Sequence, residues 1–357
     1  MKILYVITGL GQGGAERVVC DLADKMYEKG NDVKIAYLTG DILTKPRYPK
    51  IELIKINLNG LLLFPLAYIK LSKVIRIFKP DVIHSHMVHA NIFTRLIRIT
   101  TPIKKLICTA HNSNEGGHFR VILYRLTHNL AHITTNVSNT ATMSFETKKA
   151  VPKKGMLTIY NGVNLNKFKY NSSARKEVEN EFNLNSDISV ILAVGRFNKQ
   201  KNYPNLLNAI RILKETANLP FKLLIAGDGE LREHIEALIE DLNLKDDIIL
   251  LGRRSDIPKL MSACDVFVLS SDYEGLPTVL IEAMACQAQI VATDVSGVKE
   301  IVDIYGQVVP TNDSESLSNA IIKSMRRSIK NIDGAKYVKS KFDLEIISEQ
   351  WLDKYRE

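Results

Sequence analysis

Short runs of apolar, β-branched residues alternate along the chain with stretches whose apolar positions recur every three or four residues. In the first half, the short runs cover residues 2–8, 32–38, 51–58, 81–86, 105–111 and 132–138. In the second half, they cover residues 188–195, 221–227, 248–252, 266–270, 290–294 and 306–310. Amphipathic stretches such as 202–216 and 229–244 lie between them. Nearly continuous hydrophobic strands separated by helices predict parallel sheets that are covered on both faces.

Two such series follow one another, which predicts an α/β protein with two doubly wound domains. At 357 residues the chain is long enough for each domain to bury its own core. The polar segment 161–182 indicates a boundary at about residues 165–175, and we place it after residue 168. Because ligands bind beyond the carboxyl ends of strands in open sheets, we expect the two domains to face one another across a cleft lined by residues that follow strands.

The first expected strand is followed by a glycine-rich turn. Gly9, Gly11 and Gly14 match the G-x-G-x-x-G pattern of dinucleotide-binding domains. NAD also requires an acidic residue at the end of the second strand, where this chain has Thr39, with Asp41 further along. The pattern leaves two interpretations open: a dinucleotide, or another phosphate bound by backbone N–H groups at the start of the next helix.

Charge is distributed unevenly between the two halves of the chain. Residues 1–170 contain 25 Lys+Arg and 10 Asp+Glu, a net charge of +15, whereas the remainder has a net charge of −6. A surface of the first half is therefore expected to bind an anionic partner. Nucleic acid is not expected as that partner, because no recognition module is present.

Basic residues recur every third position in one predicted helix of this half, at Lys70, Lys73, Arg76 and Lys79. The segments 91–105 and 117–130 mix basic with aromatic and aliphatic residues in the same way. Such helices are typical of binding to an anionic membrane surface, and ordinary solvent-exposed helix faces are the alternative.

The positions of the cysteines and the short lengths of the apolar runs favour a soluble or peripheral protein. Cys20, Cys108, Cys264 and Cys286 are far apart and lie in apolar runs, so we expect buried free thiols. The first apolar run is too short for a signal peptide. The longest apolar patch, residues 60–69, is too short to cross a bilayer.

The second half contains Glu274 and Glu282, which are separated by seven residues. This spacing resembles the E-x7-E signature of the retaining nucleotide-sugar glycosyltransferases of glycosyltransferase family 4. Further fragments resemble the family in the same order: GGAE (13–16), DVIHSH (81–86), TAHN (109–112), YNGVN (160–164), VGRFNKQKN (194–202), IAGDGE (225–230), ACDVFVLSS (263–271) and SGVKEIV (296–302).

The resemblance covers nearly the whole chain and implies the GT-B architecture, two Rossmann-like domains around a cleft. It also implies that a C-terminal helix, residues 343–357, packs back on the first domain, with Trp351 as its anchor. We therefore expect an acceptor-binding domain of residues 1–168 with 343–357, and a nucleotide-sugar-binding domain of residues 169–342.

The resemblance also implies roles for residues of the second domain. Arg196 and Lys201 match the cations that stabilise the charge of the departing nucleoside diphosphate. Glu274 matches the residue that positions the donor sugar through its hydroxyls, and Glu282 matches the one that binds the ribose. The backbone at the start of the helix between them is expected to bind the distal phosphate, at Gly275, Leu276, Pro277 and Thr278.

Three further sites are expected from the resemblance. Arg253 and Arg254 would lie near the nucleobase, and Gly13 and Gly14 would form part of the substrate-binding turn. His111 matches a histidine that contacts donor or acceptor, where we favour positioning and electrostatics over general acid–base catalysis. Retention in this family is explained by same-face attack, and a covalent intermediate on a carboxylate is the alternative.

Neither a metal nor a cofactor is expected. His84, His86 and His89 form an H-x-H-x-x-H pattern, but no carboxylate cluster accompanies it and the family requires no metal. The chain departs from the family at residues 287–289, where Gln-Ala-Gln replaces Gly-x-Pro, which predicts a remodelled turn with activity retained. Ser296 replaces one of two common glycines near the expected sugar or phosphate.

Together these features predict a retaining, metal-independent glycosyltransferase that moves a hexose or N-acetylhexosamine from a UDP-sugar. The expected acceptor is lipid-linked, a polyprenyl diphosphate or a glycolipid, in surface polysaccharide biosynthesis. The expected location is cytoplasmic, peripherally on the inner face of the cell membrane through basic helices of the first domain. A sugar-nucleotide epimerase of the same fold and an NAD-binding oxidoreductase are the alternatives.

Overall fold

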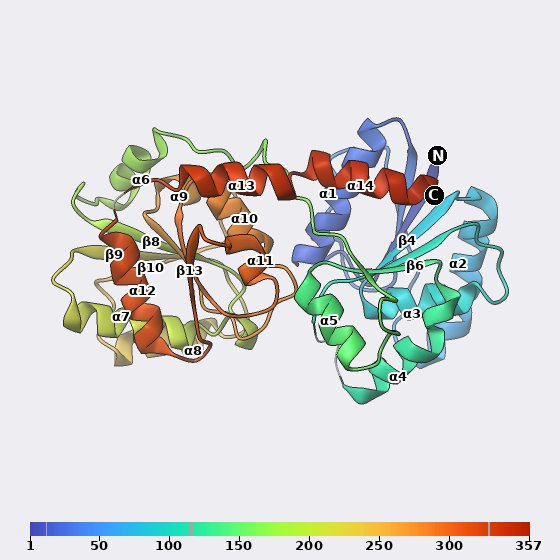
Figure 1. Cartoon of the computed structure of the whole chain (residues 1–357), viewed down its shortest axis with the longest axis horizontal. Helices are drawn as coiled ribbons and strands as arrows, with labels where there is room; N and C mark the ends of the chain where they lie inside the picture. Colours follow the sequence, from blue (N-terminus) through green and yellow to red (C-terminus); the bar gives the residue numbers. More distant parts are fainter. Residues whose placement is uncertain (12, 114–116, 328) are drawn as a thin grey trace. The chain divides into compact units, whose positions relative to one another are not determined.

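The computed structural model describes residues 1–11, 13–113, 117–327 and 329–357. The chain divides into two compact units, one formed by Met1–Asn164 with Phe342–Glu357 and the other by Leu165–Lys341. The divisions expected from the sequence, after residues 168 and 342, fall within a few residues of these. Each unit is built around one parallel sheet (Figure 1).

In the N-terminal unit, the described strands form a sheet in the order β3-β2-β1-β4-β5-β6-β7, and neighbouring strands are parallel. The strands are β1 (Lys2–Ile7), β2 (Asp32–Tyr37), β3 (Glu52–Lys55), β4 (Val82–His86), β5 (Leu106–Ala110), β6 (Ile133–Asn136) and β7 (Leu157–Thr158). The helices are α1 (Gly14–Glu28), η1 (Leu61–Leu63), α2 (Phe64–Phe78), α3 (Val88–Ile97), α4 (His118–Thr127), η2 (His128–Leu130), α5 (Asn139–Thr147) and α14 (Leu344–Arg356).

In the C-terminal unit, the described strands form a sheet in the order β10-β9-β8-β11-β12-β13, again parallel. The strands are β8 (Ser189–Val194), β9 (Phe221–Ala226), β10 (Ile248–Gly252), β11 (Val266–Leu269), β12 (Gln289–Thr293) and β13 (Gly306–Val309). The helices are α6 (Ala174–Phe182), η3 (Lys199–Lys201), α7 (Tyr203–Thr216), α8 (Arg232–Asp241), α9 (Ile257–Ala263), α10 (Thr278–Ala285), α11 (Val298–Val302), α12 (Ser314–Met325) and α13 (Ile332–Phe342).

Each face of the first sheet has its own hydrophobic core. Successive side chains of β1 point to opposite faces. Ile3, Tyr5 and Ile7 pack with residues of α1 and α14. Leu4 and Val6 pack with residues of α2 and α3. Because both faces are buried, the strand is apolar at almost every position, as the sequence pattern indicates.

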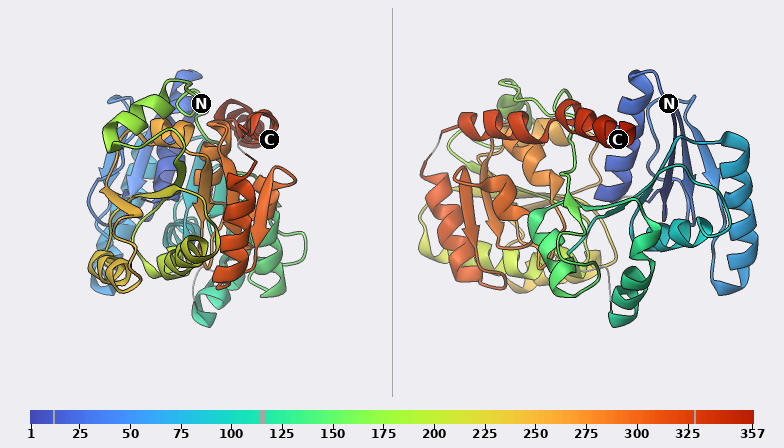
Figure 2. Two further views of the ribbon diagram at one scale, coloured as in Figure 1. Left: turned by 90° about the vertical axis from the view of Figure 1, so that its left-hand side faces the viewer. Right: turned by 45° about the vertical axis from the view of Figure 1, so that its right-hand side comes forward.

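Helix α14 covers one of these faces. Its residues Ile347, Trp351, Leu352 and Tyr355 are at most 4% exposed and belong to the same core as α1. Figures 1 and 2 show α14 beside α1. The end of the chain is therefore part of the N-terminal unit.

One strand was missed by the sequence analysis, and one turn departs from the family pattern. Strand β7 was not predicted, because two residues are too few to produce a hydrophobic period. In the turn that departs from the family pattern, Gln287 has a φ of +64°, in the left-handed region that favours glycine. The peptide N–H of Asn331 donates to the Gln287 carbonyl at 2.9 Å, so this turn is tied to the segment before α13.

All four cysteines are free and buried, which confirms the sequence prediction. Burial raises the pKa of the Cys20 thiol to about 12 and that of Cys286 to about 11. These thiols are therefore protonated and unreactive near neutral pH.

Candidate active site

Loops that follow the strands of the C-terminal unit approach one another closely at the carboxyl edge of its sheet. Gly227, after β9, has a φ of +155°, and a Cβ there would lie 1.9 Å from the carbonyl oxygen of Gly195. Gly297, after β12, has a φ of +79°, and a Cβ there would lie 2.6 Å from the carbonyl oxygen of Gly275. Glycine permits both approaches. The loop after β9 therefore packs on the loop after β8, and the loop after β12 packs on the loop after β11.

Two of the predicted site residues form an ion pair at this edge. Lys201 Nζ lies 2.7 Å from Glu274 Oε1, and the two side chains are 18% and 10% exposed. Lys201 comes from η3 after β8, and Glu274 comes from the loop after β11. The strand order places these two loops side by side, because β8 and β11 are neighbours.

Neighbouring polar groups fix both members of the pair. Gln200 Nε2 donates to Glu274 Oε2 at 3.1 Å, and the Ser271 hydroxyl donates to Glu274 Oε1 at 2.8 Å. The Lys201 backbone is held by Asn198, whose Oδ1 accepts from the Lys201 N–H at 3.2 Å. The Glu274 carboxylate is therefore held in one orientation by three donors, as a substrate-positioning group requires.

Arg196 lies on the same loop as Lys201 but has a different partner. Its Nε donates to Glu230 Oε2 at 3.0 Å, and the two side chains are 65% and 55% exposed. An ion pair so open to solvent contributes little stability, and its members exchange partners readily. Arg196 is thus available for an incoming anion, and its role beside Lys201 stays a prediction.

The start of α10 provides backbone donors next to Glu274. The helix begins at Thr278, and its N-cap residue, Pro277, makes no side-chain capping hydrogen bond. Pro277 has no N–H, so the donors expected in this segment belong to Gly275, Leu276 and Thr278. The positive end of a helix is a favourable position for a phosphate.

Glu282 lies within α10 and is half-buried. Its backbone carbonyl accepts from the Cys286 N–H at 3.2 Å, as in a regular helix. A carboxylate at this depth can accept hydrogen bonds from two adjacent hydroxyls, which is the chemistry expected for a ribose ligand.

The two arginines after β10 differ in their surroundings. Arg254 donates to both carboxylate oxygens of Asp256, at 2.8 and 2.7 Å, and lies 2.7 Å from Glu181 of α6. Hydrogen bonds from Arg254 hold the Asp256 pKa well below its usual range. Arg253 is 67% exposed and lies 4.0 Å from Asp228. The geometry therefore favours Arg253 over Arg254 as a ligand contact.

In the N-terminal unit, Gly13 is the N-cap of α1 and Gly14 is its first residue. A Cβ on Gly13 would lie 2.2 Å from Glu16 Oε2, so the Glu16 side chain folds back over the turn. Burial raises the Glu16 pKa, and a hydrogen bond to its own backbone N–H opposes this shift. The Glu16 carboxyl group therefore lies at the helix start that a bound phosphate would also approach.

His111 is buried and follows β5, at the carboxyl edge of the first sheet. It lies beside two histidines of β4, His84 and His86. His86 Nδ1 lies 3.0 Å from His111 Nε2. The ring centroids of His84 and His86 are 4.0 Å apart. Both ring nitrogens of His84 have hydrogen-bond partners. These partners are the Tyr355 hydroxyl and the Thr109 hydroxyl, each at 2.7 Å.

Burial favours the neutral form of these histidines. It lowers the His111 pKa from 6.5 to about 4, and it lowers the pKa of His84 and His86 well below 6.5. His111 is therefore neutral at physiological pH and can act there as a hydrogen-bonding group. Within the described ranges, no group of three or more His, Cys, Asp or Glu side chains is arranged to hold a metal ion.

Several contacts of the site were not predicted from the sequence. Gln200 and Glu230 lie inside fragments that resemble the family, and that position is the signal that could have identified them. Tyr355 is far from His84 in sequence. The spacing of Ile347, Trp351 and Tyr355 indicates one helix face, which is the signal available for it.

Comparisons with known proteins cover both units. The family model described as Glycosyltransferase Family 4 matches residues 12–167. The family model described as Glycosyl transferases group 1 matches residues 174–340. Together the two matches span most of the chain.

Two curated relatives have similar sequences. An N-acetylgalactosamine-N,N'-diacetylbacillosaminyl-diphospho-undecaprenol 4-alpha-N-acetylgalactosaminyltransferase of Campylobacter jejuni is 27% identical, over 88% of this chain and 88% of the relative. A UDP-Gal:alpha-D-GlcNAc-diphosphoundecaprenol alpha-1,3-galactosyltransferase of Escherichia coli is 28% identical, over 74% of this chain and 72% of the relative.

The fold is similar to that of a solved structure, Anabaena HepE in complex with UDP and glucose. The TM-score is 0.83 with 20% sequence identity, and the match covers 99% of each chain. With its two parallel-sheet units, the chain therefore has the GT-B fold.

Proposed function

The chain belongs to glycosyltransferase family 4, and we propose that it transfers a hexose or N-acetylhexosamine from a UDP-sugar to a lipid-linked acceptor with retention of configuration. The observation that carries this proposal is the Lys201–Glu274 pair beside the start of α10. A cation, a carboxylate and backbone donors meet there at one sheet edge. A donor with a sugar next to a diphosphate needs all three kinds of group.

The donor site stabilises the leaving group. Lys201 and Arg196 bind the diphosphate oxygens, and the N–H groups at the start of α10 bind the distal phosphate. Glu274 accepts hydrogen bonds from hydroxyls of the sugar, and Glu282 accepts them from the ribose. Arg253 lies towards the nucleobase. No divalent cation is needed in this scheme, because the protein's own cations and dipoles neutralise the developing charge.

The transfer step conserves atoms and charge. The bond between the anomeric carbon and the phosphate oxygen breaks, and the electron pair stays on that oxygen. The acceptor hydroxyl forms its bond to the anomeric carbon on the same face and gives its proton to the departing phosphate oxygen. Glu274 positions the sugar and forms no covalent bond, and neutral His111 acts as a positioning group towards donor or acceptor.

The relatives support the substrate classes. The names of both relatives include an undecaprenol-linked diphosphate, and that of the Escherichia coli protein also includes a UDP-sugar. We extend these classes to this chain: a UDP-sugar donor and a polyprenyl-diphosphate-linked glycan acceptor, in the assembly of a surface polysaccharide or glycolipid.

Contact with a membrane follows from the acceptor. Among the described residues, no helix is long and apolar enough to span a bilayer. On α2, Lys70, Lys73 and Arg76 are exposed beside the exposed apolar residues Ile69 and Ile77. We assign this helix to peripheral contact with an anionic surface on the cytoplasmic side of the membrane, where charge attracts and apolar groups insert.

Two measurements test the proposal. The first is the thermal stability of the purified chain with UDP, GDP, ADP or NAD, since a ligand stabilises the state that it binds. The second is mass spectrometry and NMR of products formed from a panel of UDP-sugars and a polyprenyl-diphosphate-linked sugar, with and without EDTA. Stabilisation by UDP and a product with the donor's anomeric configuration would support the proposal.

Other outcomes would overturn it. Stabilisation by NAD alone would favour an oxidoreductase. Conversion of a UDP-sugar to its epimer without an acceptor would favour an epimerase. Loss of transfer in EDTA, restored by a divalent cation, would contradict the metal-independent mechanism.

A further inference from the structure

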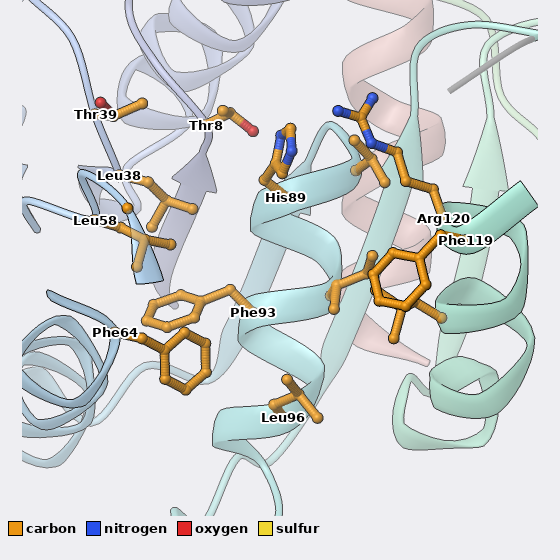
Figure 3. A pocket seen from close by; sticks show the side chains of 14 residues that line it. Thr8, Leu38, Thr39, Leu58, Phe64, His89, Phe93, Leu96, Phe119 and Arg120 are labelled. Atoms are coloured by element: carbon orange, nitrogen blue, oxygen red, sulfur yellow. The ribbon is translucent and has the colours of Figure 1, made fainter. Parts of the chain in front are cut away.

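An apolar pocket in the N-terminal unit plays no part in the steps assigned above. Its volume is about 610 Å³, within the range typical of small-molecule sites. Helices α2, α3 and α4 provide most of its wall, through Phe64, Ile92, Phe93, Leu96 and Leu123 (Figure 3). Phe64 and Phe93 are in edge contact, with ring centroids 5.3 Å apart, so this part of the wall is well packed.

The two ends of the pocket differ in polarity. Thr8, His89 and Arg120 lie at one end, and Leu96 lies at the other (Figure 3). Thr8 follows β1, and its hydroxyl is buried without a hydrogen-bond partner among the residues that the structure describes. A buried hydroxyl is expected to have a partner, and a bound polar ligand would supply one. The polar end also has the charge of Arg120.

The helices that line the pocket also carry exposed apolar faces. On α4, the exposed apolar residues Phe119, Ile122 and Leu126 are three and four positions apart, so they lie on one face of the helix. On η1 and α2 the exposed apolar residues include Leu62, Leu66 and Ile69. Phe119 is 71% exposed and also lines the pocket. Exposed apolar faces of this kind mark contact with a membrane or another apolar partner.

We propose that this pocket binds the isoprenoid chain of the lipid-linked acceptor, in the units next to its diphosphate. The apolar wall suits a hydrocarbon chain, and Arg120 with Thr8 suits the diphosphate at its end. The exposed faces of α2 and α4 suit a substrate that is drawn from a bilayer. The inference rests on the proposed function, because it takes a polyprenyl diphosphate as the acceptor's anchor.

The test uses substitutions that fill the pocket with a larger side chain. Calorimetry then measures binding of farnesyl diphosphate to the full chain. Leu123→Trp on α4 and Leu96→Trp on α3 add bulk to two different walls. Met143→Trp is the matched control, because Met143 is an exposed apolar residue of the same unit, on α5. Each pocket variant is expected to weaken farnesyl diphosphate about tenfold or more, since several methylene contacts are lost. Inorganic pyrophosphate and UDP should bind all variants as they bind the wild type.

Circular dichroism and thermal unfolding identify any variant that fails to fold. Because the two variants lie on different helices, the other can still be tested if one does not fold. The inference is overturned if both folded pocket variants bind farnesyl diphosphate like the wild type. It is also overturned if the wild type binds farnesyl diphosphate no better than inorganic pyrophosphate.

The proposed function and the pocket fail in different ways. If the wild type binds farnesyl diphosphate through the pocket but transfers no sugar to any polyprenyl-linked acceptor, the proposed function fails, and only the affinity of the pocket for an isoprenoid chain stands. If transfer is equally efficient with farnesyl-linked and ethyl-linked sugar diphosphates, in the wild type and in Leu123→Trp, the function stands and the pocket is refuted.

Discussion

The ammonium group of Lys201 lies 2.7 Å from the carboxylate of Glu274, and each side chain is less than one-fifth exposed. Each charge offsets the cost of removing the other from water. The two residues therefore act as one unit, although they come from different loops. Removing either one leaves the other charge largely buried without its ionic partner.

This coupling predicts a non-additive pattern of stability. Lys201→Met keeps the aliphatic stem, which packs against Gly195, but removes the charge. It should lower the free energy of unfolding by about 1–3 kcal/mol, and Lys201→Met with Glu274→Gln should recover most of this loss. Urea denaturation of the two single variants and the double variant measures the effect. Additive losses would show that the pair is not coupled.

The same variants separate stability from catalysis. Lys201→Met and Glu274→Gln should each lower kcat about 10²–10³-fold, and the double variant should not recover activity, because both groups act on the donor. Steady-state kinetics with the preferred UDP-sugar checks this. A glycosyl adduct trapped on another residue of Glu274→Gln would contradict same-face transfer and indicate a covalent route.

Arg196 should matter for activity and not for stability. Its ion pair with Glu230 is open to solvent, so Arg196→Ala should leave the Tm nearly unchanged. Loss of a cation at the diphosphate should lower kcat about 10²-fold. Arg211→Ala is the matched control, because Arg211 forms a similar exposed ion pair with Glu215 on α7. Equal kinetics of the two variants would remove Arg196 from the mechanism.

The fold was predictable because the strands at the centre of each sheet are buried on both faces. Alternate residues of β1 enter two different cores, so the strand is a continuous apolar run in the sequence. Strand β7, with two residues, has no such pattern. Among the described strands its one partner is β6, at the edge of the sheet, and that pairing is a tertiary contact.

The sequence predicted that Lys201 and Glu274 belong to one site, and the structure places the two side chains in contact. The site was less predictable where a side chain's partner comes from elsewhere in the chain. Arg254 near the nucleobase stays a prediction, and the sequence did not indicate its ion pair with Glu181 on α6. Nothing in the sequence near Arg254 indicates that α6 packs on α9. The link between His84 and Tyr355 is hidden for the same reason.

The departure from the family pattern at Gln287 predicts a gain in stability. A side chain at a φ of +64° costs about 1 kcal/mol relative to glycine. Gln287→Gly should therefore raise the Tm by about 2–4 °C without changing kcat. Gln287→Ala is the control, since it shortens the side chain but keeps the Cβ. A Tm of Gln287→Gly at or below that of Gln287→Ala would contradict the assignment of strain to this position.

The buried histidines predict that stability depends on pH. The folded chain holds the His111 pKa at about 4, whereas an exposed histidine titrates near 6.5. Below pH 6.5 the unfolded chain binds a proton that the folded chain does not, so the free energy of unfolding falls as the pH falls from 6.5 towards 4. His84 and His86 shift in the same direction, which steepens the fall. Above pH 6.5 their contribution is complete.

Chemical denaturation at a series of pH values between about 5 and 8 measures this slope, which reports the difference in bound protons. His86→Gln should reduce the slope by about one proton, because one buried histidine is removed. His234→Gln is the control, since His234 is an exposed histidine on α8. A wild-type stability that stays constant from pH 8 to 5 would show that these histidines are accessible to protons in the folded state.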